Sequence, residues 1–254
     1  MEGLHTIISS NIRFDNPADG VQCWDMRQSV LSNVLLSHHP FLIGTQEGRH
    51  SQHLEFSQKL TNYKLCAAHR PWIDERMYPC IYLLNDLTQD IQSGDAWLSE
   101  TPGIAGSHLA GSAFPRLCTW VRLNLQGQSV VVLNLHLDFL ETDTRMRQCE
   151  ILCDEIKRQT TANDRVIIMG DFNDSPGSRV HTHLLDSCHK FYDPWSTQEE
   201  PSHHSFSGSA WQGQRIDWIL LDRRLKCDEI FLDKTRQGQV WPSDHYPLVC
   251  RFRF

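Results

Sequence analysis

Short apolar runs recur along this chain, and polar side chains that can bind ions or exchange protons stand directly beside five of them. The runs occupy residues 7–8, 41–43, 166–168, 218–221 and 246–249, and the neighbouring polar residues are Asn11, Glu47, Asp171, Asn173, Asp217, Asp244 and His245. Runs of this kind predict buried β-strands. Because the strands of a sheet end along a common edge, we expect these polar side chains to lie close together in space.

Apolar periodicity predicts strands in alternation with helices. Strands are expected at residues 4–12, 41–46, 78–84, 117–125, 129–137, 165–169, 216–221 and 248–254, and helices at 24–37, 50–60 and 143–158. Gly127 separates two of these strands and predicts a hairpin turn. Residues 99–115 and 194–214 are rich in Pro, Gly and Ser and predict loops. The pattern indicates packed sheets covered by helices, but it does not give the order of the strands.

The length of 254 residues and the hydrophobic content of 40% fit a globular chain with a substantial core. We expect one α/β domain over residues 1–254. The formal net charge is -7 and no run of Lys and Arg occurs, which disfavours tight non-specific binding to nucleic acid but leaves a local basic groove open. No segment has the roughly 18 consecutive apolar residues that a membrane span needs.

The nine cysteines include no Cys-x-x-Cys pair, and the first residues do not resemble a signal peptide. We therefore expect reduced thiols and a cytoplasmic location. Cys149 and Cys153 share one face of a predicted helix, where a zinc site or two buried thiols would fit, and we prefer the buried thiols. The histidine pairs 181/183 and 203/204 are expected to be exposed on loops, because no thiol or acid completes a zinc ligand set.

The polar groups beside the strands suit one kind of chemistry. Mg²⁺ prefers carboxylate, amide and water oxygens, and phosphoryl transfer needs such a cation, an oriented water and donors for the developing charge. Each motif also has a simpler interpretation: residues 170–173 as a turn, residues 243–245 as a local hydrogen-bond cluster and Glu47 as a solvated acid. Because all of them occur in one chain, we favour a phosphoryl-transfer site.

Six motifs together resemble those of the endonuclease/exonuclease/phosphatase superfamily. They are Ser10-Asn11-Ile12, Thr45-Gln46-Glu47, Asn134-Leu135-His136, Gly170-Asp171-Phe172-Asn173, Arg215-Ile216-Asp217-Trp218 and the segment from Ser243 to Leu248. They occur in the family's order and span nearly the whole chain. The resemblance implies a four-layer α/β/β/α sandwich with the site at one end of the paired sheets. The segments Asn11 to Asp15, Gly44 to Glu47 and Trp97 to Pro102 further resemble small bacterial members whose substrates are unassigned.

The resemblance also implies the residues that hold the metal and carry the reaction. Glu47 is expected to be the principal Mg²⁺ ligand, with Asn11 beside it and Asp244 as a further ligand or supporting carboxylate. Asp171 is expected to orient or deprotonate the attacking water. His245 is the second candidate for the general base, and the sequence does not choose between the two.

Three further residues complete the catalytic set that the resemblance implies. Asp217 is expected to be the carboxylate partner of His245, which would hold the tautomer of the imidazole and favour its charged form. Asn173 is expected to donate a hydrogen bond to the pentacovalent phosphorus centre. His136 is expected to contact the phosphate and to assist the leaving group.

Arg13 stands where apurinic endonucleases of the superfamily carry an acid. It lies two residues beyond Asn11, so on a strand both side chains would face the same side, and Arg13 would reach a substrate phosphate. The alternative is that Arg13 pairs with Asp15 or Glu47 and only braces the site. Arg116 precedes a predicted strand and is a second candidate for substrate binding, with a structural salt bridge as its alternative.

We therefore expect a hydrolase of phosphomonoesters or phosphodiesters that depends on Mg²⁺, with Mn²⁺ able to substitute. A small organic phosphate or a nucleotide-type substrate is favoured over polymeric nucleic acid, because of the net charge and of Arg13. One alternative is a DNA or RNA nuclease of the same superfamily. The other is a catalytically inactive binding protein, which the intact catalytic set disfavours. The sequence gives no oligomeric state.

Overall fold

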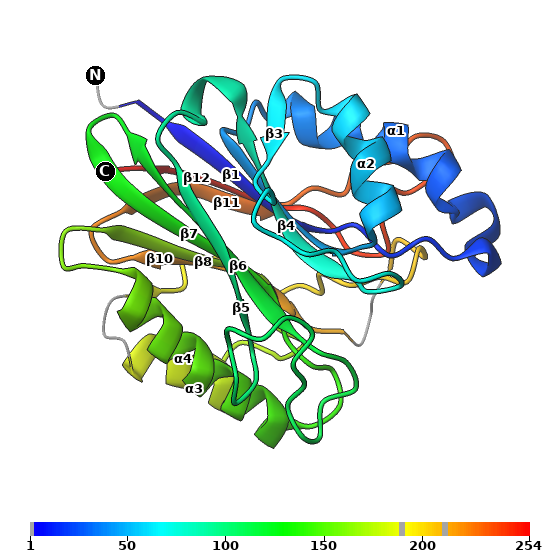
Figure 1. The fold of residues 1–254 in the computed structure, drawn as a ribbon. Helices are drawn as coiled ribbons and strands as arrows, with labels where there is room; N and C mark the ends of the chain where they lie inside the picture. Colours follow the sequence, from blue (N-terminus) through cyan, green and yellow to red (C-terminus); the bar gives the residue numbers. More distant parts are fainter. Residues whose placement is uncertain (1–2, 188–190, 210–212) are drawn as a thin grey trace.

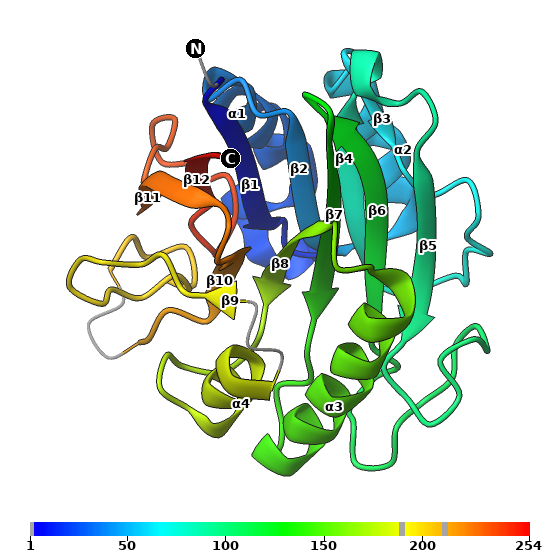
Figure 2. The ribbon, with the colours of Figure 1, turned by 90° about the vertical axis from the view of Figure 1, so that its left-hand side faces the viewer.

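The apolar runs form two six-stranded β-sheets in the computed structural model of the chain, which describes residues 3–187, 191–209 and 213–254 (Figure 1, Figure 2). The strand order of the first sheet is β11 (Lys226–Leu232), β12 (Leu248–Arg253), β1 (His5–Asn11), β2 (Leu42–Gly48), β4 (Tyr78–Leu84) and β3 (Tyr63–Leu65). The order of the second sheet is β5 (Gln92–Trp97), β6 (Leu117–Leu125), β7 (Gln128–His136), β8 (Arg165–Asp171), β10 (Asp217–Asp222) and β9 (Phe191–Tyr192).

Helices cover the outer face of each sheet (Figure 1). The helices on the first sheet are α1 (Trp24–Ser37) and α2 (His50–Lys59), and those on the second are α3 (Thr142–Gln159) and α4 (Arg179–Ser187). Two short 3₁₀ helices, η1 (Pro17–Gln22) and η2 (Asn85–Leu87), lie in connections. This arrangement confirms the predicted four-layer α/β/β/α sandwich. Within the described ranges, no helix has the length and apolar character needed to cross a membrane.

The layers follow from the strand sequences, because neighbouring residues of a strand point to opposite faces. In β1, Ile7 packs between the two sheets, whereas Ile8 packs beneath the helices of the first sheet. In β8, Ile167 lies between the sheets and Ile168 packs against α3. Since both faces of such strands are buried, their sequences are continuously apolar rather than alternating.

Every predicted strand and helix is present, and its ends differ from the prediction by at most two residues. The hairpin around Gly127 is confirmed: Gln126 and Gly127 have φ values of 54° and 81°, the positive pair that a type I′ turn between twisted strands requires. The predicted loop at 99–115 is irregular, as is the described part of 194–214; residues 210–212 lie outside the described ranges.

The elements that were not predicted in the described ranges are the strands β3, β5, β9 and β11, the helix α4 and the two 3₁₀ helices. The four strands among them are the edge strands of the two sheets. An edge strand has only one neighbour and is more exposed, so its sequence needs fewer apolar residues. In β11, only Leu232 is buried, and the strand therefore lacks the apolar signal on which the prediction depended.

The strand register brings polar residues side by side at one edge of the second sheet. His136 ends β7 and is paired with Asp171 on the parallel strand β8, and Asp171 is paired with Asp217 on the antiparallel strand β10. Paired residues point to the same face, so all three side chains share the face of Ile167 and Met169, which packs against the first sheet. The site therefore lies between the ends of the two sheets.

Gly170 allows this register, because a side chain at this position would collide with β7. Its φ of 144° favours glycine, and a Cβ at this position would lie 2.0 Å from the carbonyl oxygen of Leu135. The glycine in front of Asp171 is therefore a steric requirement of the strand pair.

A buried ion pair ties the two sheets together away from this edge. Arg70 donates from Nε and Nη2 to the two oxygens of Asp95 in β5, at 2.7 Å each. Nη2 also donates to the carbonyl of Pro79 in β4, at 3.1 Å, and to Thr119 in β6. Burial alone would raise the pKa of Asp95, but the hydrogen bonds from Arg70 lower it to about 2.

We expect Arg70→Ala to lower the free energy of unfolding by about 3–5 kcal/mol, because it leaves the Asp95 carboxylate buried without its partner. The control is Arg179→Ala, which removes an ion pair with Asp143 whose side chains are 66% and 87% exposed. This change should cost less than about 1 kcal/mol. Urea denaturation followed by circular dichroism measures both losses. Equal losses would contradict the role given to the buried pair.

Candidate active site

Three residues at the strand ends adopt left-handed backbone conformations. Arg13, Glu47 and Asn173 have φ values of 54°, 67° and 49°. Glu47 also lies where the register between β2 and β4 shifts, between Thr45 and Gly48, and such a bulge re-aims a side chain. Left-handed backbone at a residue other than glycine costs about 1–3 kcal/mol and is concentrated at functional sites. The strain therefore marks this edge as a candidate site.

Asn11 joins the carboxylates of the two sheets. Its amide nitrogen Nδ2 donates to Oε1 of Glu47 at 2.9 Å and to Oδ2 of Asp171 at 3.0 Å. Its oxygen Oδ1 accepts the backbone N–H of Arg13 at 2.9 Å. In this orientation Asn11 offers a donor rather than an oxygen ligand to the site, so it positions the two carboxylates.

His245 lies between two carboxylates, and the structure brings it to Asp217 as the sequence predicted. Its Nδ1 lies 2.8 Å from Oδ2 of Asp217, and its Nε2 lies 3.9 Å from Oδ2 of Asp171. All three residues are buried. Burial by itself would lower the pKa of His245, but the negative charges of Asp217 and Asp171 raise it well above its usual value. The two carboxylates therefore favour the protonated form of the imidazole.

His136 is the second histidine of the site, and it differs from His245 in charge. Its Nε2 lies 3.5 Å from Oδ2 of Asp171 and 3.0 Å from Nδ2 of Asn173. Burial, together with the positive charge of Arg116, lowers the pKa of His136 well below its usual value. A neutral imidazole here accepts the hydrogen bond of the Asn173 amide. The backbone N–H of Asn173 in turn donates to Oδ1 of Asp171 at 2.9 Å.

Arg116 is a buried cation without a matching acceptor. Its residue is 6% exposed, and its Nε lies 3.8 Å from Oδ2 of Asp138 but has no hydrogen-bond partner. The oxygens of Asp138 instead accept hydrogen bonds from Ser112, Ala113 and Leu140. Burial also lowers the pKa of Arg116, as expected for an incompletely paired charge. The structural salt bridge that was the alternative role for Arg116 is therefore limited to this long contact with Asp138.

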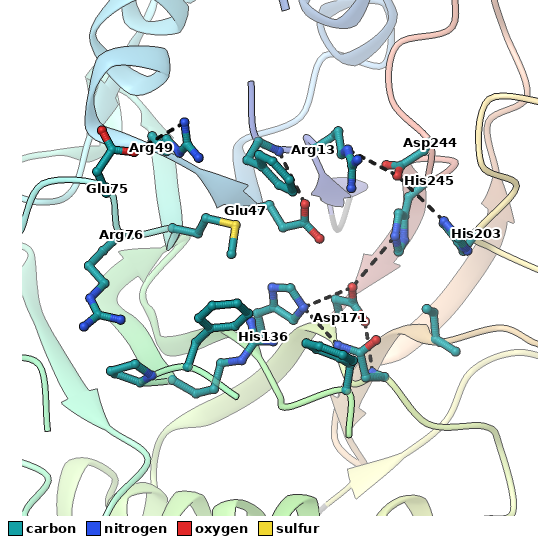
Figure 3. Close-up of a pocket in the computed structure, with 18 of the residues that line it drawn as sticks. Arg13, Glu47, Arg49, Glu75, Arg76, His136, Asp171, His203, Asp244 and His245 are labelled. Carbon is teal, nitrogen blue, oxygen red and sulfur yellow. Dashed lines mark hydrogen bonds and ion pairs between the residues drawn. The ribbon is translucent and has the colours of Figure 1, made fainter. Parts of the chain in front are cut away.

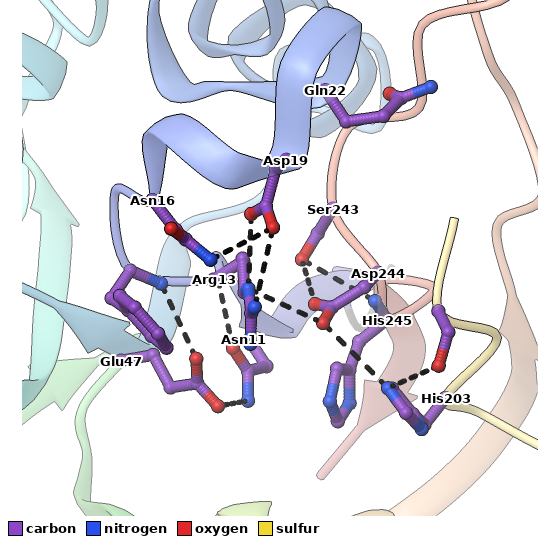
Figure 4. A network of polar contacts seen from close by, with 12 residues as sticks. Asn11, Arg13, Asn16, Asp19, Gln22, Glu47, His203, Ser243, Asp244 and His245 are labelled. Atoms are coloured by element: carbon purple, nitrogen blue, oxygen red, sulfur yellow. Dashed lines mark hydrogen bonds and ion pairs between the residues drawn. The ribbon is translucent and has the colours of Figure 1, made fainter.

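Arg13 does not lie on β1, which ends at Asn11, so the prediction from strand alternation was wrong. Its left-handed backbone directs the side chain toward Asp19 and Asp244, whereas the sequence predicted Asp15 or Glu47 as the partner. The guanidinium lies 3.2 Å from Asp19 in η1 and 3.7 Å from Asp244 (Figure 4). Because two carboxylates already face Arg13, its guanidinium stabilises the edge of the site and is less available to bind a substrate phosphate.

Asp244 groups with histidines rather than with Glu47. Its Oδ2 lies 3.7 Å from Nε2 of His203, whose ring lies 4.7 Å from the ring of His245. His203 is on a loop, as predicted, but an isolated β-bridge to His245 brings it into the site, and nothing in the sequence signalled this contact. His181 and His204 are buried, so the prediction of exposed histidines was wrong for both.

These side chains open onto one pocket of about 840 Å³, the size of a small-molecule site (Figure 3). The predicted site residues that line it are Arg13, Glu47, Arg116, His136, Asp171, Asn173, Asp244 and His245. The other two, Asn11 and Asp217, lie behind this layer and are buried. Apolar side chains complete the walls: Phe14, Ile73, Met77, Phe114, Phe139 and Ile216.

A family model described as the endonuclease/exonuclease/phosphatase family matches residues 8–245 of the chain. The chain belongs to this family. Its members are metal-dependent phosphoesterases, so the chain is an enzyme of that class. The resemblance seen in the sequence motifs is confirmed.

Solved structures show the same fold for other members, whereas a search of curated proteins gave no match. The mannosyl-6-phosphatase of Bacteroides thetaiotaomicron has a TM-score of 0.88 at 22% identity, over 98% of this chain and 100% of that one. An endonuclease/exonuclease/phosphatase from Bacteroides vulgatus has 0.89 at 20%, over 99% of each chain. D. rerio TDP2, complexed with single strand DNA product, has 0.75 at 16%, over 100% of each chain.

The donor set of this family member fits a hard divalent cation. One oxygen of Glu47, one oxygen of Asp171 and one nitrogen of His136 lie within 4.8 Å of one another. Burial, followed by the negative charges of Asp217 and Glu47, raises the pKa of Asp171 above its usual value. A cation would relieve this repulsion, and carboxylate oxygens are the ligands that Mg²⁺ and Mn²⁺ prefer.

The pairing of Asp217 with His245 gives a test that needs no substrate. Asp217→Asn removes the nearest negative charge, so the pKa of His245 should fall by about one unit or more. The histidine titration can be followed by NMR in the presence of EDTA. Asp222→Asn, at the far end of the same strand, is the matched control and should leave this pKa unchanged. An unaltered His245 pKa in Asp217→Asn would remove Asp217 as its charge partner.

Proposed function

We propose that this phosphoesterase hydrolyses the phosphate ester of a small organic or nucleotide-type molecule by attack of water at phosphorus, with Mg²⁺ as the cation and Mn²⁺ as a substitute. The observation that carries the proposal is the convergence of three groups on one pocket: the carboxylates of Glu47 and Asp171, the His245 imidazole beside Asp217 and the incompletely paired Arg116. This set combines anion binding with groups that handle protons. We also propose that residues 1–254 act as one domain, because both sheets supply the site.

Substrate binding depends on the donors that face the pocket. Arg116 lines the pocket with an incompletely paired guanidinium, which suits a phosphate oxygen, since a buried cation with poor pairing gains most from an anion. The Asn173 amide and the His136 ring lie beside the same carboxylate and would face the phosphate as it becomes pentacovalent. Arg13 would contribute by fixing Asp19 and Asp244.

The metal would be held by Glu47, together with the facing oxygen of Asp171 directly or through water. When bound, the cation would neutralise phosphate oxygens and favour the ionised form of a water. Asn11 keeps Glu47 and Asp171 together through its two hydrogen bonds. These bonds support a positioning role for Asn11 in our proposal, and the contacts of Asp244 with His203 and His245 favour a supporting role for that carboxylate.

Proton handling falls to Asp171 and His245. The Asp171 carboxylate lies 3.5 Å from Nε2 of His136 and 3.9 Å from Nε2 of His245, and we propose that it orients and deprotonates the attacking water. The negative charges of Asp217 and Asp171 favour the protonated form of His245, so we assign its Nε2 as a hydrogen-bond donor to a phosphate oxygen. The reverse assignment, with His245 as the base, is the alternative. The cytoplasmic location stays a prediction.

A nuclease acting on DNA or RNA is the second candidate, because D. rerio TDP2, which shares the fold, is described as complexed with single strand DNA product. The net charge of -7 and the pocket, whose volume suits a small molecule, favour the small substrate. A catalytically inactive binding protein is disfavoured, since the residues of the catalytic set converge at one edge.

Metal removal should abolish activity. Chelation with EDTA is expected to stop phosphate release, and Mg²⁺ or Mn²⁺ is expected to restore it, because the repelling carboxylates need a cation between them. Glu47→Gln should raise the Mg²⁺ concentration that gives half-maximal activity by about 10-fold or more. A Mg²⁺ titration of phosphate release measures both effects. Full activity in a thoroughly chelated sample would contradict the metal mechanism.

A substrate screen with matched variants tests the proposed function. The panel contains nucleotides, sugar phosphates, inositol phosphates, bis-p-nitrophenyl phosphate, single-stranded RNA and plasmid DNA. We expect release of phosphate from a small ester, with kcat reduced at least about 100-fold in Asp171→Asn and His245→Ala. Asp143→Asn, an exposed acid, is the control. Cleavage of DNA or RNA alone would establish the nuclease, and no hydrolysis of any substrate would favour a binding protein.

A further inference from the structure

The reaction described above uses one side of the pocket. Figure 3 shows Arg49, Glu75 and Arg76 on the side opposite Asp171 and His245, with other lining residues between them. The pocket volume of about 840 Å³ is near the upper end of the range for small-molecule sites. A phosphate at the reacting carboxylates therefore leaves room for a larger part of the substrate.

The wall of the pocket beyond the reacting groups is apolar. Phe14, Ile73 and Met77 line it together with Phe114 and Phe139. The last two residues are 42% and 52% exposed, and their ring centroids are 6.4 Å apart. Exposed aromatic surface inside a pocket is stabilised when a ligand covers it. This region suits an apolar or flat organic group.

Arg49 has a donor that the protein does not satisfy. Its Nε is buried and has no hydrogen-bond partner. Its Nη1 lies 3.6 Å from Oε2 of Glu75, but that carboxylate side chain is 83% exposed, so water screens the pair. The guanidinium is held 5.3 Å above the ring of Phe14. The Arg49 side chain is 34% exposed and lines the pocket, so an anion there would give its weakly paired guanidinium a charge-assisted hydrogen bond.

Arg76 lies at the same end of the pocket, in the connection between β3 and β4. Of the carboxylates in the described chain, none is within ion-pair distance of its guanidinium. Asp74 and Glu75 also line this end of the pocket, but both are exposed, so solvent screens their charges. Arg49 and Arg76 therefore form a second cationic position, separate from Arg116 at the reacting end.

We propose that Arg49 and Arg76 form a subsite for a second anionic group of the substrate. The substrate is then a phosphate ester that carries a further phosphate or carboxylate across an apolar or flat spacer. Guanidinium groups suit both anions, because their paired N–H donors match two oxygens at once. This inference rests on the proposed function, since it describes the remainder of the same substrate.

A matched substrate series tests the Arg49/Arg76 subsite. Linear alkanediol bisphosphates of increasing length are compared with alkyl monophosphates of the same length, and ω-carboxyalkyl phosphates form a third arm. At one or more spacer lengths, we expect the second anion to raise kcat/KM by about 10-fold or more, the scale of a charge-assisted hydrogen bond. This exceeds the statistical advantage of two equivalent phosphates. The carboxylate arm shows which anion the subsite prefers.

Variants separate the subsite from general charge effects. Arg49→Ala and Arg76→Ala should each remove most of the advantage of the second anion. Arg158→Ala, at the end of α3 and 60% exposed, should leave that advantage intact. If Arg49→Ala fails to fold, Arg76→Ala and the wild-type series decide the matter.

Two results would overturn the subsite while the proposed function stands. One is an equal kcat/KM for monophosphates and dianionic esters at every length. The other is an advantage that both arginine variants retain in full. Absence of hydrolysis from every ester would instead overturn the proposed function and the subsite with it.

Discussion

One side-chain amide joins the two halves of the site. Asn11 belongs to the first sheet, and its Nδ2 binds Glu47 from the same sheet and Asp171 from the other. Behind it, Gln46 donates to Asn134 across the same gap at 2.7 Å. Buried polar groups are unfavourable unless paired, so these bonds fix how far one sheet slides over the other. The positions of the remaining strand ends at this edge depend on the alignment of the two sheets.

The same alignment brings together charges that repel. The mutual repulsion of Glu47, Asp171 and Asp217 is unfavourable, and the positive charges of His245, Arg116 and Arg13 offset part of it. The fold tolerates the strain because its cores are apolar and its inter-sheet contacts, such as the pair formed by Arg70, are well satisfied. Function at this edge is therefore maintained at the expense of local stability, as is common for sites that bind cations and phosphates.

Central strands and their terminal polar residues could be predicted from the sequence, because burial on both faces imposes an apolar run and the register then groups the residues after it. Edge strands such as β11 could not, since exposure removes that signal. At the site, the convergence of Asp171 and Asp217 could be predicted, because both residues stand at the ends of apolar strands. The direction of the Arg13 side chain could not be predicted, because it depends on a left-handed φ and on Asp19 in a short helix. The place of His203 depends on a tertiary bridge that no local pattern encodes.

The pairing of β1 with β12 has a consequence for how the enzyme comes into being. Ser9 is opposite Leu248, so the first and last strands are neighbours, and Asn11 and His245 reach the site from nearly opposite ends of the sequence. Closing so long a loop carries an entropy cost that only the finished sheet recovers. The site is therefore assembled only once β12 has paired with β1, so hydrolysis requires the pairing of strands that lie far apart in the sequence.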